Sequence, residues 1–299
     1  MTTLPESQAL HVDLDGAWPN DLLGLRRVEA REWGPRLRFS APPRLVERFY
    51  REFAPRFARF VVYGSGDFHY LSALWVRRVT EPITLVSFDN HPDWAITPPR
   101  WAAGAWVNRA LELPQVERVS VWGCGNFECW WPANLLGNGR AERAGKLEVH
   151  PWADDRPPQD RQRRGAILRG NWRDKFSAFA SALSGAAVYV TIDIDCLVAD
   201  EAVTNWENGG FTIVDLEWAL SELWRSARIV GGDICGAYSP AQYARRKQRF
   251  AANWDHPKLP LREPADVQRI NSRTLARLLP ALTQGDQDHA TGNEQSAGG

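Results

Sequence analysis

Side chains suited to metal coordination occur in three short segments of this chain of 299 residues. Each segment follows a run of apolar, largely β-branched residues that is typical of a buried strand. In open parallel sheets, ligands bind at the carboxyl ends of the strands, where the loops leave together. We therefore expect one site that combines His69 from GSGDFH, Asp89, His91 and Asp93 from SFDNHPD, and Asp193 and Asp195 from TIDIDC.

Spacing and charge predict the kind of site. Residues two apart in an extended segment point the same way, so the ligands of one segment can face a single point. A carboxylate at the end of an apolar strand costs free energy unless it is paired or coordinated. No Lys or Arg lies close in sequence to the four aspartates, whereas two divalent cations would balance them. Oxygen-rich sites with some imidazole suit Mn²⁺, so we expect two Mn²⁺ ions, with other divalent transition metals as alternatives.

A single segment would be weak evidence for a metal. Strand ends commonly carry Asp as a cap or turn residue, and that reading fits Asp193 and Asp195 taken alone. The group in SFDNHPD is more specific. Three such strand ends in one alternating α/β chain favour coordination.

The elements that must position these residues alternate along the chain. Short apolar strands separated by helices predict a parallel sheet covered on both faces, a three-layer αβα fold with a mostly parallel central sheet. The expected strands are 10–16, 59–70, 83–93, 118–126, 146–152, 186–196 and 228–238, and the expected helices are 43–57, 71–79, 102–113, 171–185, 213–227 and 265–282. No linker divides them, so we predict one domain over residues 1–283. The polar tail, 284–299, is expected to be disordered.

Composition limits the possible partners. The 36 basic residues balance 36 acidic ones, which argues against a nucleic-acid partner or an anionic membrane surface. The chain shows neither a signal-peptide pattern nor an apolar run long enough to span a membrane, so we expect a cytoplasmic protein. The four cysteines are expected to be reduced and structural, and strand alternation should point Cys196 away from the site.

The three motifs, in this order and spacing, resemble those of the arginase, agmatinase and formiminoglutamase (ureohydrolase) superfamily. GSGDFH is similar to its Gly-Gly-Asp-His element, SFDNHPD to Asp-Ala-His-x-Asp, and TIDIDCL to Ser-x-Asp-x-Asp-x-x-Asp. The resemblance covers roughly residues 61–240 and implies an arginase/deacetylase-like fold. It also implies that His69 and Asp93 complete one metal site, that His91 and Asp195 complete the other, and that Asp89 and Asp193 bridge them.

By the same resemblance, the two metals hold a bridging hydroxide that acts as the nucleophile. The implied activity is hydrolysis of a linear, non-peptide C–N bond of the guanidino, amidino or formimino type in a small-molecule substrate. Asp89 and Asp193 are catalytic in this sense, because they hold the hydroxide. Superfamily members are usually oligomeric, so the resemblance allows a homo-oligomer.

The sequence departs from the superfamily pattern at three positions. Gly236 stands where guanidine-cleaving members carry a glutamate, so a guanidinium would lose a charge-assisted partner. Val198 replaces the third aspartate of the last motif. The loop after His91 lacks the proton-shuttle histidine of arginases, which leaves His150 as the candidate for that role. These departures predict a substrate that is recognised unlike arginine.

Candidates for substrate binding follow from the same comparison. Trp94, Trp106 and Asn108, together with Trp101, are expected to line the pocket, since an aromatic wall suits a flat substrate or a cation held by ring faces. Asp233 or Glu201 would substitute for the missing glutamate.

Two other functions fit the sequence. A deacetylase-like amidohydrolase shares the expected fold but would need only one metal, and the presence of both His69 and Asp93 weighs against it. A non-catalytic binding protein could keep the metal site as a structural element, which would explain the missing glutamate and histidine.

Overall fold

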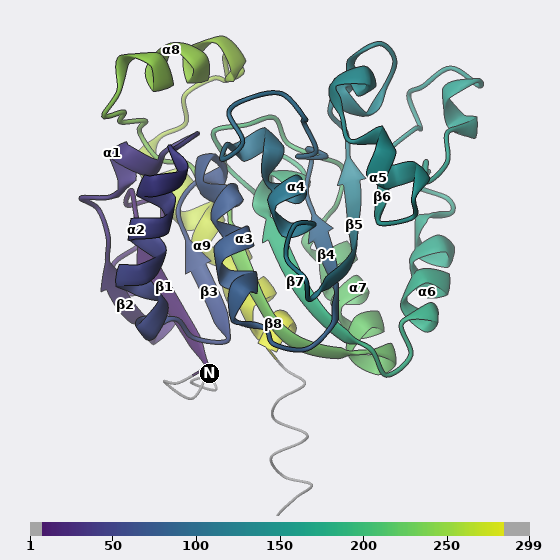
Figure 1. The fold of residues 1–299 in the computed structure, drawn as a ribbon, viewed down its shortest axis with the longest axis horizontal. Helices are drawn as coiled ribbons and strands as arrows, with labels where there is room; N and C mark the ends of the chain where they lie inside the picture. Colours follow the sequence, from purple (N-terminus) through teal and green to yellow (C-terminus); the bar gives the residue numbers. More distant parts are fainter. Residues whose placement is uncertain (1–7, 284–299) are drawn as a thin grey trace, which may run out of the picture.

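The fold is described from a computed structural model over residues 8–283, so the predicted disordered tail, 284–299, lies outside the described residues. Eight parallel strands form one sheet in the order β2-β1-β3-β8-β7-β4-β5-β6 (Figure 1). Their bounds are β1 Ala9–Asp13, β2 Arg26–Glu29, β3 Phe60–Tyr63, β4 Ile83–Phe88, β5 Val116–Cys124, β6 Leu147–Pro151, β7 Ala187–Asp193 and β8 Arg228–Cys235. The predicted parallel sheet is confirmed.

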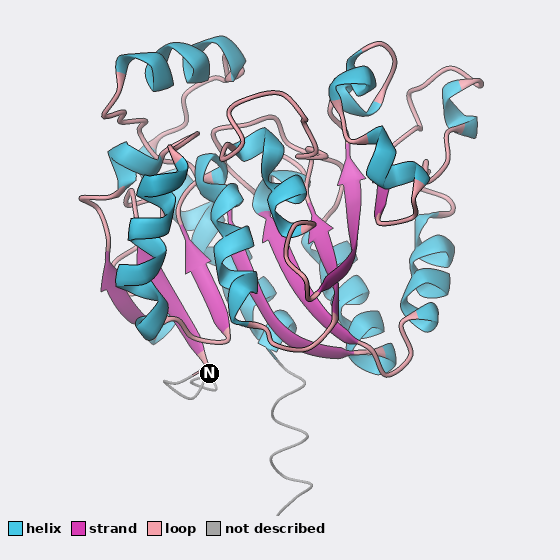
Figure 2. Ribbon diagram, viewed as in Figure 1, coloured by secondary structure: helices cyan, strands magenta, loops and turns pink. Residues whose placement is uncertain are grey.

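Helices cover both faces of the sheet, which gives the three layers expected from the sequence (Figure 2). The α-helices are α1 Gly34–Leu37, α2 Pro43–Phe53, α3 Ser72–Trp75, α4 Trp106–Ala110, α5 Gly139–Arg143, α6 Trp172–Ala182, α7 Ile213–Ser226, α8 Arg246–Asp255 and α9 Pro264–Thr283. The 3-10 segments are η1 Leu22–Gly24, η2 Ala54–Arg56, η3 Gly66–Leu71, η4 Val76–Arg78, η5 Ala103–Ala105, η6 Phe127–Cys129, η7 Ala133–Leu136, η8 Asp160–Gln162 and η9 Ile194–Cys196. None of the helices between residues 8 and 283 is long and apolar enough to cross a membrane.

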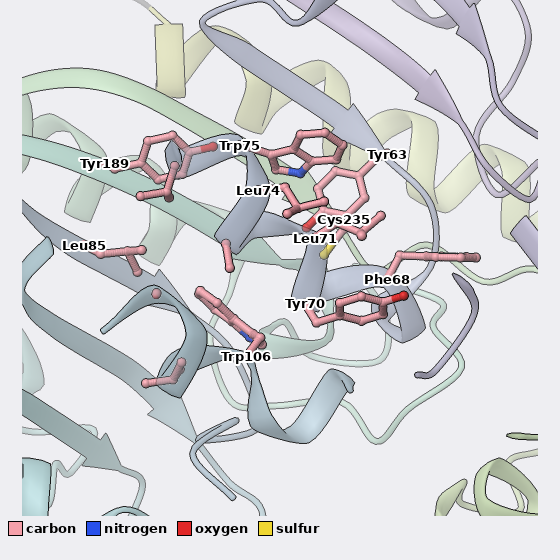
Figure 3. Close-up of a cluster of buried hydrophobic side chains, with 14 of the residues drawn as sticks. Tyr63, Phe68, Tyr70, Leu71, Leu74, Trp75, Leu85, Trp106, Tyr189 and Cys235 are labelled. Atoms are coloured by element: carbon pink, nitrogen blue, oxygen red, sulfur yellow. The ribbon is translucent and has the colours of Figure 1, made fainter. Parts of the chain in front are cut away.

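Strand alternation produces the two cores. In β4, Leu85 packs into the core formed with α2, α3 and α4, whereas Val86 and Phe88 pack into the core formed with α6, α7 and α9. Because both faces are covered, all six residues of β4 and all seven of β7 are buried. Figure 3 shows part of the first core, with Tyr63, Trp75 and Trp106 among its labelled side chains.

Three expectations about elements need correction. The edge strand β2 and helix α8 were not expected, and the helices expected over 71–79 and 102–113 are shorter, with 3-10 turns at their ends. Residues 66–70, expected to continue a strand, lie in the 3-10 helix η3, Gly66–Leu71. Helix α8 lies at the upper edge of Figure 1, beyond the carboxyl ends of the strands.

Candidate metal centre

The six predicted ligands meet at the carboxyl ends of three strands. Asp89 follows β4, Asp193 ends the neighbouring β7, and His69 lies on η3 after β3. Strand β8 separates β3 from β7 in the sheet, so His69 reaches across the end of β8. All six residues are buried, with His91 the most exposed at 9%.

The first group of potential ligand atoms surrounds His69. Its Nδ1 lies 3.0 Å from Asp89 Oδ2, 3.4 Å from Asp93 Oδ2 and 3.6 Å from Asp193 Oδ2. His69, Asp89 and Asp93 each offer one ligand atom, and these atoms lie within 4.8 Å of one another. The geometry therefore suits one cation held by these residues.

A second group surrounds His91. Its Nδ1 lies 2.9 Å from Asp195 Oδ2 and 3.6 Å from Asp89 Oδ1. Asp89, His91 and Asp195 meet the same 4.8 Å condition. Asp89 thus belongs to both groups, with one oxygen directed to each, as expected of a bridging carboxylate. Asp193 groups with His69 and Cys235 instead.

The backbone reason for this convergence differs from the expected one. Asp195 lies in the 3-10 turn η9, not in an extended strand, and its Oδ1 accepts a hydrogen bond from the amide of Asn90. Asp93 has a positive φ of 46°, and the Trp106 indole donates to its Oδ2 at 2.6 Å. Turns and hydrogen bonds between segments therefore orient these two carboxylates, whereas the alternation of side chains along an extended strand does not.

A buried network of hydrogen bonds holds the Nε2 side of the His69 ring. Its Nε2 lies 2.9 Å from Thr191 Oγ1, and that hydroxyl donates to Asp233 Oδ1 at 2.7 Å. Ser72 and Tyr189 also donate to Asp233, which is fully buried. A ring nitrogen that donates on one side leaves the other nitrogen free to coordinate, so this network favours Nδ1 as the ligand atom.

Burial and mutual contacts shift the pKa values of the ligands. Burial alone would lower the pKa of His69, but its contacts with Asp89 and Asp93 outweigh burial and raise it well above the usual value. Burial, with the nearby charge of Asp89, raises the pKa of Asp93 to about 7, and burial also raises that of Asp195 to about 7. In the absence of a cation, protons are therefore held among these groups, and a bound cation would displace them.

Buried polar atoms that lack a hydrogen-bond partner indicate whether the site suits a metal ion. Among the described residues, the buried atoms without a hydrogen-bond partner include His69 Nδ1 and Asp89 Oδ2, two of the potential ligands. Buried polar atoms in native proteins are nearly always satisfied, so orphaned atoms facing one another point to a missing ligand. Four carboxylates and two imidazoles suit Mn²⁺. All four cysteines are buried and free, and Cys196 lies in the core away from the ligands, as expected.

Gly236 has a steric role that the sequence did not reveal. Its φ is +107°, and a Cβ placed on it would lie 2.1 Å from Asp193 Oδ1 and 2.8 Å from the amide of Ile194. No side chain fits there in this backbone conformation. A glutamate at position 236 would therefore clash with Asp193 where this backbone places it.

The ligands open into a small cavity of about 60 Å³. Its remaining lining comes from the 3-10 segments η3, η5 and η6, from loops and from the end of α8: Gly66, Ala103, Gly104, Asn126, Phe127, Glu128, Trp206, Glu207 and Asp255. Sequence reasoning missed Glu128, Trp206, Glu207 and Asp255. For Glu128 a signal was present, because it follows β5, the neighbour of β4, at the same edge of the sheet.

The side chains expected to bind substrate lie elsewhere. Trp94, Trp106, Asn108, Glu201 and Asp233 do not line the cavity. Trp106 and Asp233 support ligands, as described above. The amide nitrogen of Asn108 donates to the carbonyl oxygens of Trp94 and Ala95, and Glu201 accepts a hydrogen bond from the amide of Ile213.

His150 also lies away from the cavity. Its ring stacks on Trp122 with centroids 3.7 Å apart, and its Nδ1 lies 3.1 Å from the carbonyl oxygen of Gly165. It belongs to β6, the edge strand two places from β4. The structure does not bring it to the six candidate ligands.

Comparison with known proteins gives relatives at low sequence identity. No protein-family model matches the chain. An uncharacterized protein of Thermotoga maritima is 26% identical over 190 residues, which is 64% of this chain and 62% of that protein. The match thus spans less than two thirds of the relative's length.

Solved structures match over nearly the whole chain. Proclavaminate amidino hydrolase from Streptomyces clavuligerus has a TM-score of 0.56 at 12% identity, covering 95% of this chain and 94% of its own. Arginase from Medicago truncatula has a TM-score of 0.54 at 15% identity, covering 92% and 86%. Formimidoylglutamase from Bacillus subtilis has a TM-score of 0.54 at 12% identity, covering 94% and 86%. The expected arginase-like fold is thus confirmed.

Proposed function

We propose that this chain is a divergent member of the ureohydrolase superfamily that hydrolyses a linear, non-peptide C–N bond of the guanidino, amidino or formimino type. The observation that carries the proposal is the pair of ligand groups that share Asp89. The fold shared with an arginase, an amidino hydrolase and a formimidoylglutamase supports the reaction class.

The residues divide into two metal sites. His69 and Asp93 would complete one site and His91 and Asp195 the other, with Asp89 shared between the two groups. Asp193, whose Oδ2 lies 3.6 Å from His69 Nδ1, is proposed as the second bridge on the basis of the resemblance alone. Two divalent cations, of which Mn²⁺ suits the ligands best, would lower the pKa of a water molecule enough for it to attack at neutral pH.

Other residues of the chain would fix and shield this centre. The Trp106 indole holds Asp93, and Thr191 with Asp233 sets the tautomer of His69. The burial of the six ligands limits access of bulk water, and substrate would reach them through the small cavity. Low solvent access strengthens every electrostatic contact inside such a site.

Substrate recognition would differ from that of arginine. Gly236 offers no carboxylate, and its contact with Asp193 leaves no room for one. Guanidinium or amidinium recognition in this chain must therefore come from other residues that line the cavity.

Metal content and product release test the proposal together. We expect the protein, after Mn²⁺ supplementation and desalting, to retain at least about one metal per chain and to release urea, ammonia or formamide from some member of a guanidino, amidino and formimino panel. Asp89→Asn should lose both properties. Asp174→Asn, an exposed aspartate on α6, is the matched control.

The outcomes separate the functions. Retained metal with release of acetate alone from an amide panel would contradict the proposal in favour of a deacetylase. Retained metal with no turnover of any compound would contradict catalysis and leave a binding protein. Failure of the protein to retain metal would contradict the proposed metal-dependent hydrolysis.

The assembly and cellular location are further proposals. We propose a small-molecule substrate, a homo-oligomeric assembly and a cytoplasmic location. Light scattering on the purified protein measures the assembly, and fractionation of the source cells measures the location.

A further inference from the structure

Helix α8 directs two large aromatic side chains away from the protein. Phe250 is 73% exposed and Trp254 is 86% exposed. They stand four residues apart and so lie on one face of the helix. The residues that α8 buries, Gln248 and Ala252, lie on the opposite face, since residues two apart in a helix point roughly 200° apart. The helix lies at the upper edge of Figure 1, so the face with Phe250 and Trp254 is an outer face of the molecule.

Basic residues share this outer face. Arg246 and Lys247 stand four and three residues before Phe250, which places all three on the same side of the helix. Arg249 flanks them. These three cations are exposed, and within residues 8–283 none of them forms an ion pair. Their charge is therefore not balanced by a neighbouring carboxylate.

The chain after α8 continues the same combination of charge and apolar surface. Leu259 is 39% exposed and Leu261 is 87% exposed. Lys258 and Arg262 beside them are exposed and form no ion pair in the described part of the chain. Exposed apolar side chains that gather in one region commonly mark an interaction surface.

The positive charge of this region is local. Residues 245–262 include a single acidic residue, Asp255, against these basic residues: Arg245, Arg246, Lys247, Arg249, Lys258 and Arg262. The equal totals of 36 basic and 36 acidic residues describe the whole chain and do not reflect this excess. An argument from net charge alone therefore does not apply to this surface.

The combination of side chains discriminates between possible partners. A second copy docked through the same face would bring like charges together, which is unfavourable. A single-stranded nucleic acid could use the cations and the rings, but Leu259 and Leu261 offer neither a charge nor a ring on which a base stacks. A bilayer with anionic headgroups suits all of them, because Trp, Phe and Leu enter the boundary of the acyl chains while Lys and Arg contact the phosphates.

We propose that α8 and the following residues, 256–262, form a docking surface for an anionic phospholipid bilayer, on which the helix lies without crossing it. Phe250 and Trp254 would enter the interface, and Arg246 and Lys247 would contact lipid phosphates. The inference goes beyond the proposed hydrolysis and does not depend on it, because lipid binding needs neither the metal nor turnover.

Sedimentation of the full chain with vesicles tests the proposal. Vesicles of phosphatidylcholine with about one third phosphatidylglycerol are compared with vesicles of phosphatidylcholine alone, at about 0.1 M salt. We expect at least about tenfold tighter binding to the anionic vesicles, because each Lys or Arg close to such a surface contributes roughly fivefold. About 1 M salt should remove most of this difference by screening. Equal binding to both vesicles, or binding to neither, would overturn the proposal.

One pair of variants tests the charges. Arg246→Gln/Lys247→Gln should weaken binding to the anionic vesicles by at least about tenfold. Arg143→Gln/Lys146→Gln is the matched control, since it also removes two exposed cations that form no ion pair within residues 8–283, but next to the edge strand β6. It should bind as the unmodified chain does. Equal losses in both double variants would overturn the assignment to α8.

A second pair tests the apolar contact. Trp254→Ala should weaken binding to the same vesicles by at least about fivefold, because less apolar surface leaves water. Trp131→Ala is the control: Trp131 is 79% exposed but stands in a stretch, 119–139, without a Lys or an Arg. Binding that is unchanged in Trp254→Ala, or weakened equally in both variants, would overturn the docking surface.

Other occupants of the outer face would give different results. Tighter binding of a single-stranded oligonucleotide than of the anionic vesicles would overturn the proposal in favour of a nucleic acid. A smaller assembly of Trp254→Ala in light scattering, with vesicle binding unchanged, would assign the face to a second copy and would also overturn it. The lipid and salt dependences are measured on the unmodified chain, so they decide the proposal even if a variant folds poorly.

Discussion

Gly236 shows how a single residue can connect substrate choice to the metal centre. Its positive φ and its closeness to Asp193 mean that a side chain there must displace a candidate ligand. The absence of the glutamate is then a steric property of this backbone. Adding the glutamate would not restore recognition of arginine, because the local structure has no room for it.

We therefore predict that Gly236→Ala lowers stability and metal content together. The left-handed conformation and the clash with Asp193 should cost roughly 2–5 kcal/mol in the free energy of unfolding. Gly185→Ala is the control, since Gly185 also has a positive φ, of +73°, but has open space around it, and it should cost about 1–2 kcal/mol. Urea unfolding and elemental analysis measure the two effects. Equal losses in both variants would show that the contact with Asp193 is unimportant.

His11, on β1, predicts a pH dependence that is independent of the metal centre. The residue is 1% exposed, and burial lowers its pKa from 6.5 to about 4. The unfolded chain takes up a proton at His11 below pH 6.5, whereas the folded chain does so only near pH 4, so stability falls as the pH falls through this window. At 1.36 kcal/mol per pKa unit, the full loss is about 3 kcal/mol.

The measurement is a difference between two proteins. Urea unfolding at pH 7.5 and pH 5 should show a smaller acid-induced loss of stability in His11→Leu than in the unmodified chain, because the other titrating groups are common to both. A loss of the same size in both proteins would refute the role of His11.

Sequence patterns predicted the helices and strands whose apolar residues pack into the two cores. The strands other than β2 and the helices α2, α6, α7 and α9 carry apolar residues in the expected periods, so most of the sheet and both covering layers could be predicted. Strand β2, with the sequence RRVE, buries only Val28 and gives no apolar run. Helix α8 buries only Gln248 and Ala252, so its sequence lacks an amphipathic signal.

The residues of the site also fall into some that the sequence predicts and some that it does not. The six candidate ligands stand in short motifs at strand ends, where sequence and topology coincide. Glu207 and Asp255 line the cavity because a loop and the end of a helix are brought to the carboxyl ends of the strands. Tertiary contacts place that loop and that helix, and no local sequence pattern predicts such contacts. His150 does not line the cavity, because its strand β6 lies at the edge of the sheet.

Helix α8, whose last residue Asp255 lines the cavity, should behave as a weakly held element. Its hydrogen bonds to the rest of the described chain lie at its two ends and at Gln248. Arg245 donates to the carbonyl oxygens of Arg36 and Ser40, and Gln248 donates to that of Arg38. His256 Nε2 lies 2.6 Å from Asp67 Oδ1, and the His256 ring packs edge-on against Phe39 and Trp206. Elements with few buried apolar contacts open at a low free-energy cost. The contact between His256 and Asp67 anchors the end of the helix that carries Asp255.

We predict that His256→Ala speeds amide hydrogen exchange across 246–255 at least several-fold and leaves α7 unchanged. Asn253→Ala, an exposed position on the same helix, is the control and should not speed exchange. Exchange followed by mass spectrometry measures both. Unchanged exchange in His256→Ala would mean that other contacts hold the helix.

For the whole molecule, the metal centre is a crosslink between distant parts of the chain. It would join η3, the loop after β4 and the end of β7, across the middle of the eight-stranded sheet. Without cations, the like charges of its carboxylates remain buried together, and only protons and two imidazoles offset them. Folded protein should therefore bind metal far better than the unfolded chain, and the two equilibria should be linked.

Metal removal should consequently lower the thermal stability of the entire domain. At a free Mn²⁺ concentration one hundred times the dissociation constant, linkage contributes about 2.7 kcal/mol, which corresponds to a rise in Tm of roughly 4 °C over the chelated protein. Calorimetry with Mn²⁺ and with EDTA measures the shift, and Asp89→Asn should show little of it because both ligand groups lose a shared carboxylate. Identical melting with and without Mn²⁺ would contradict a metal centre, whereas an equal shift in Asp89→Asn would place the bound metal somewhere else in the molecule.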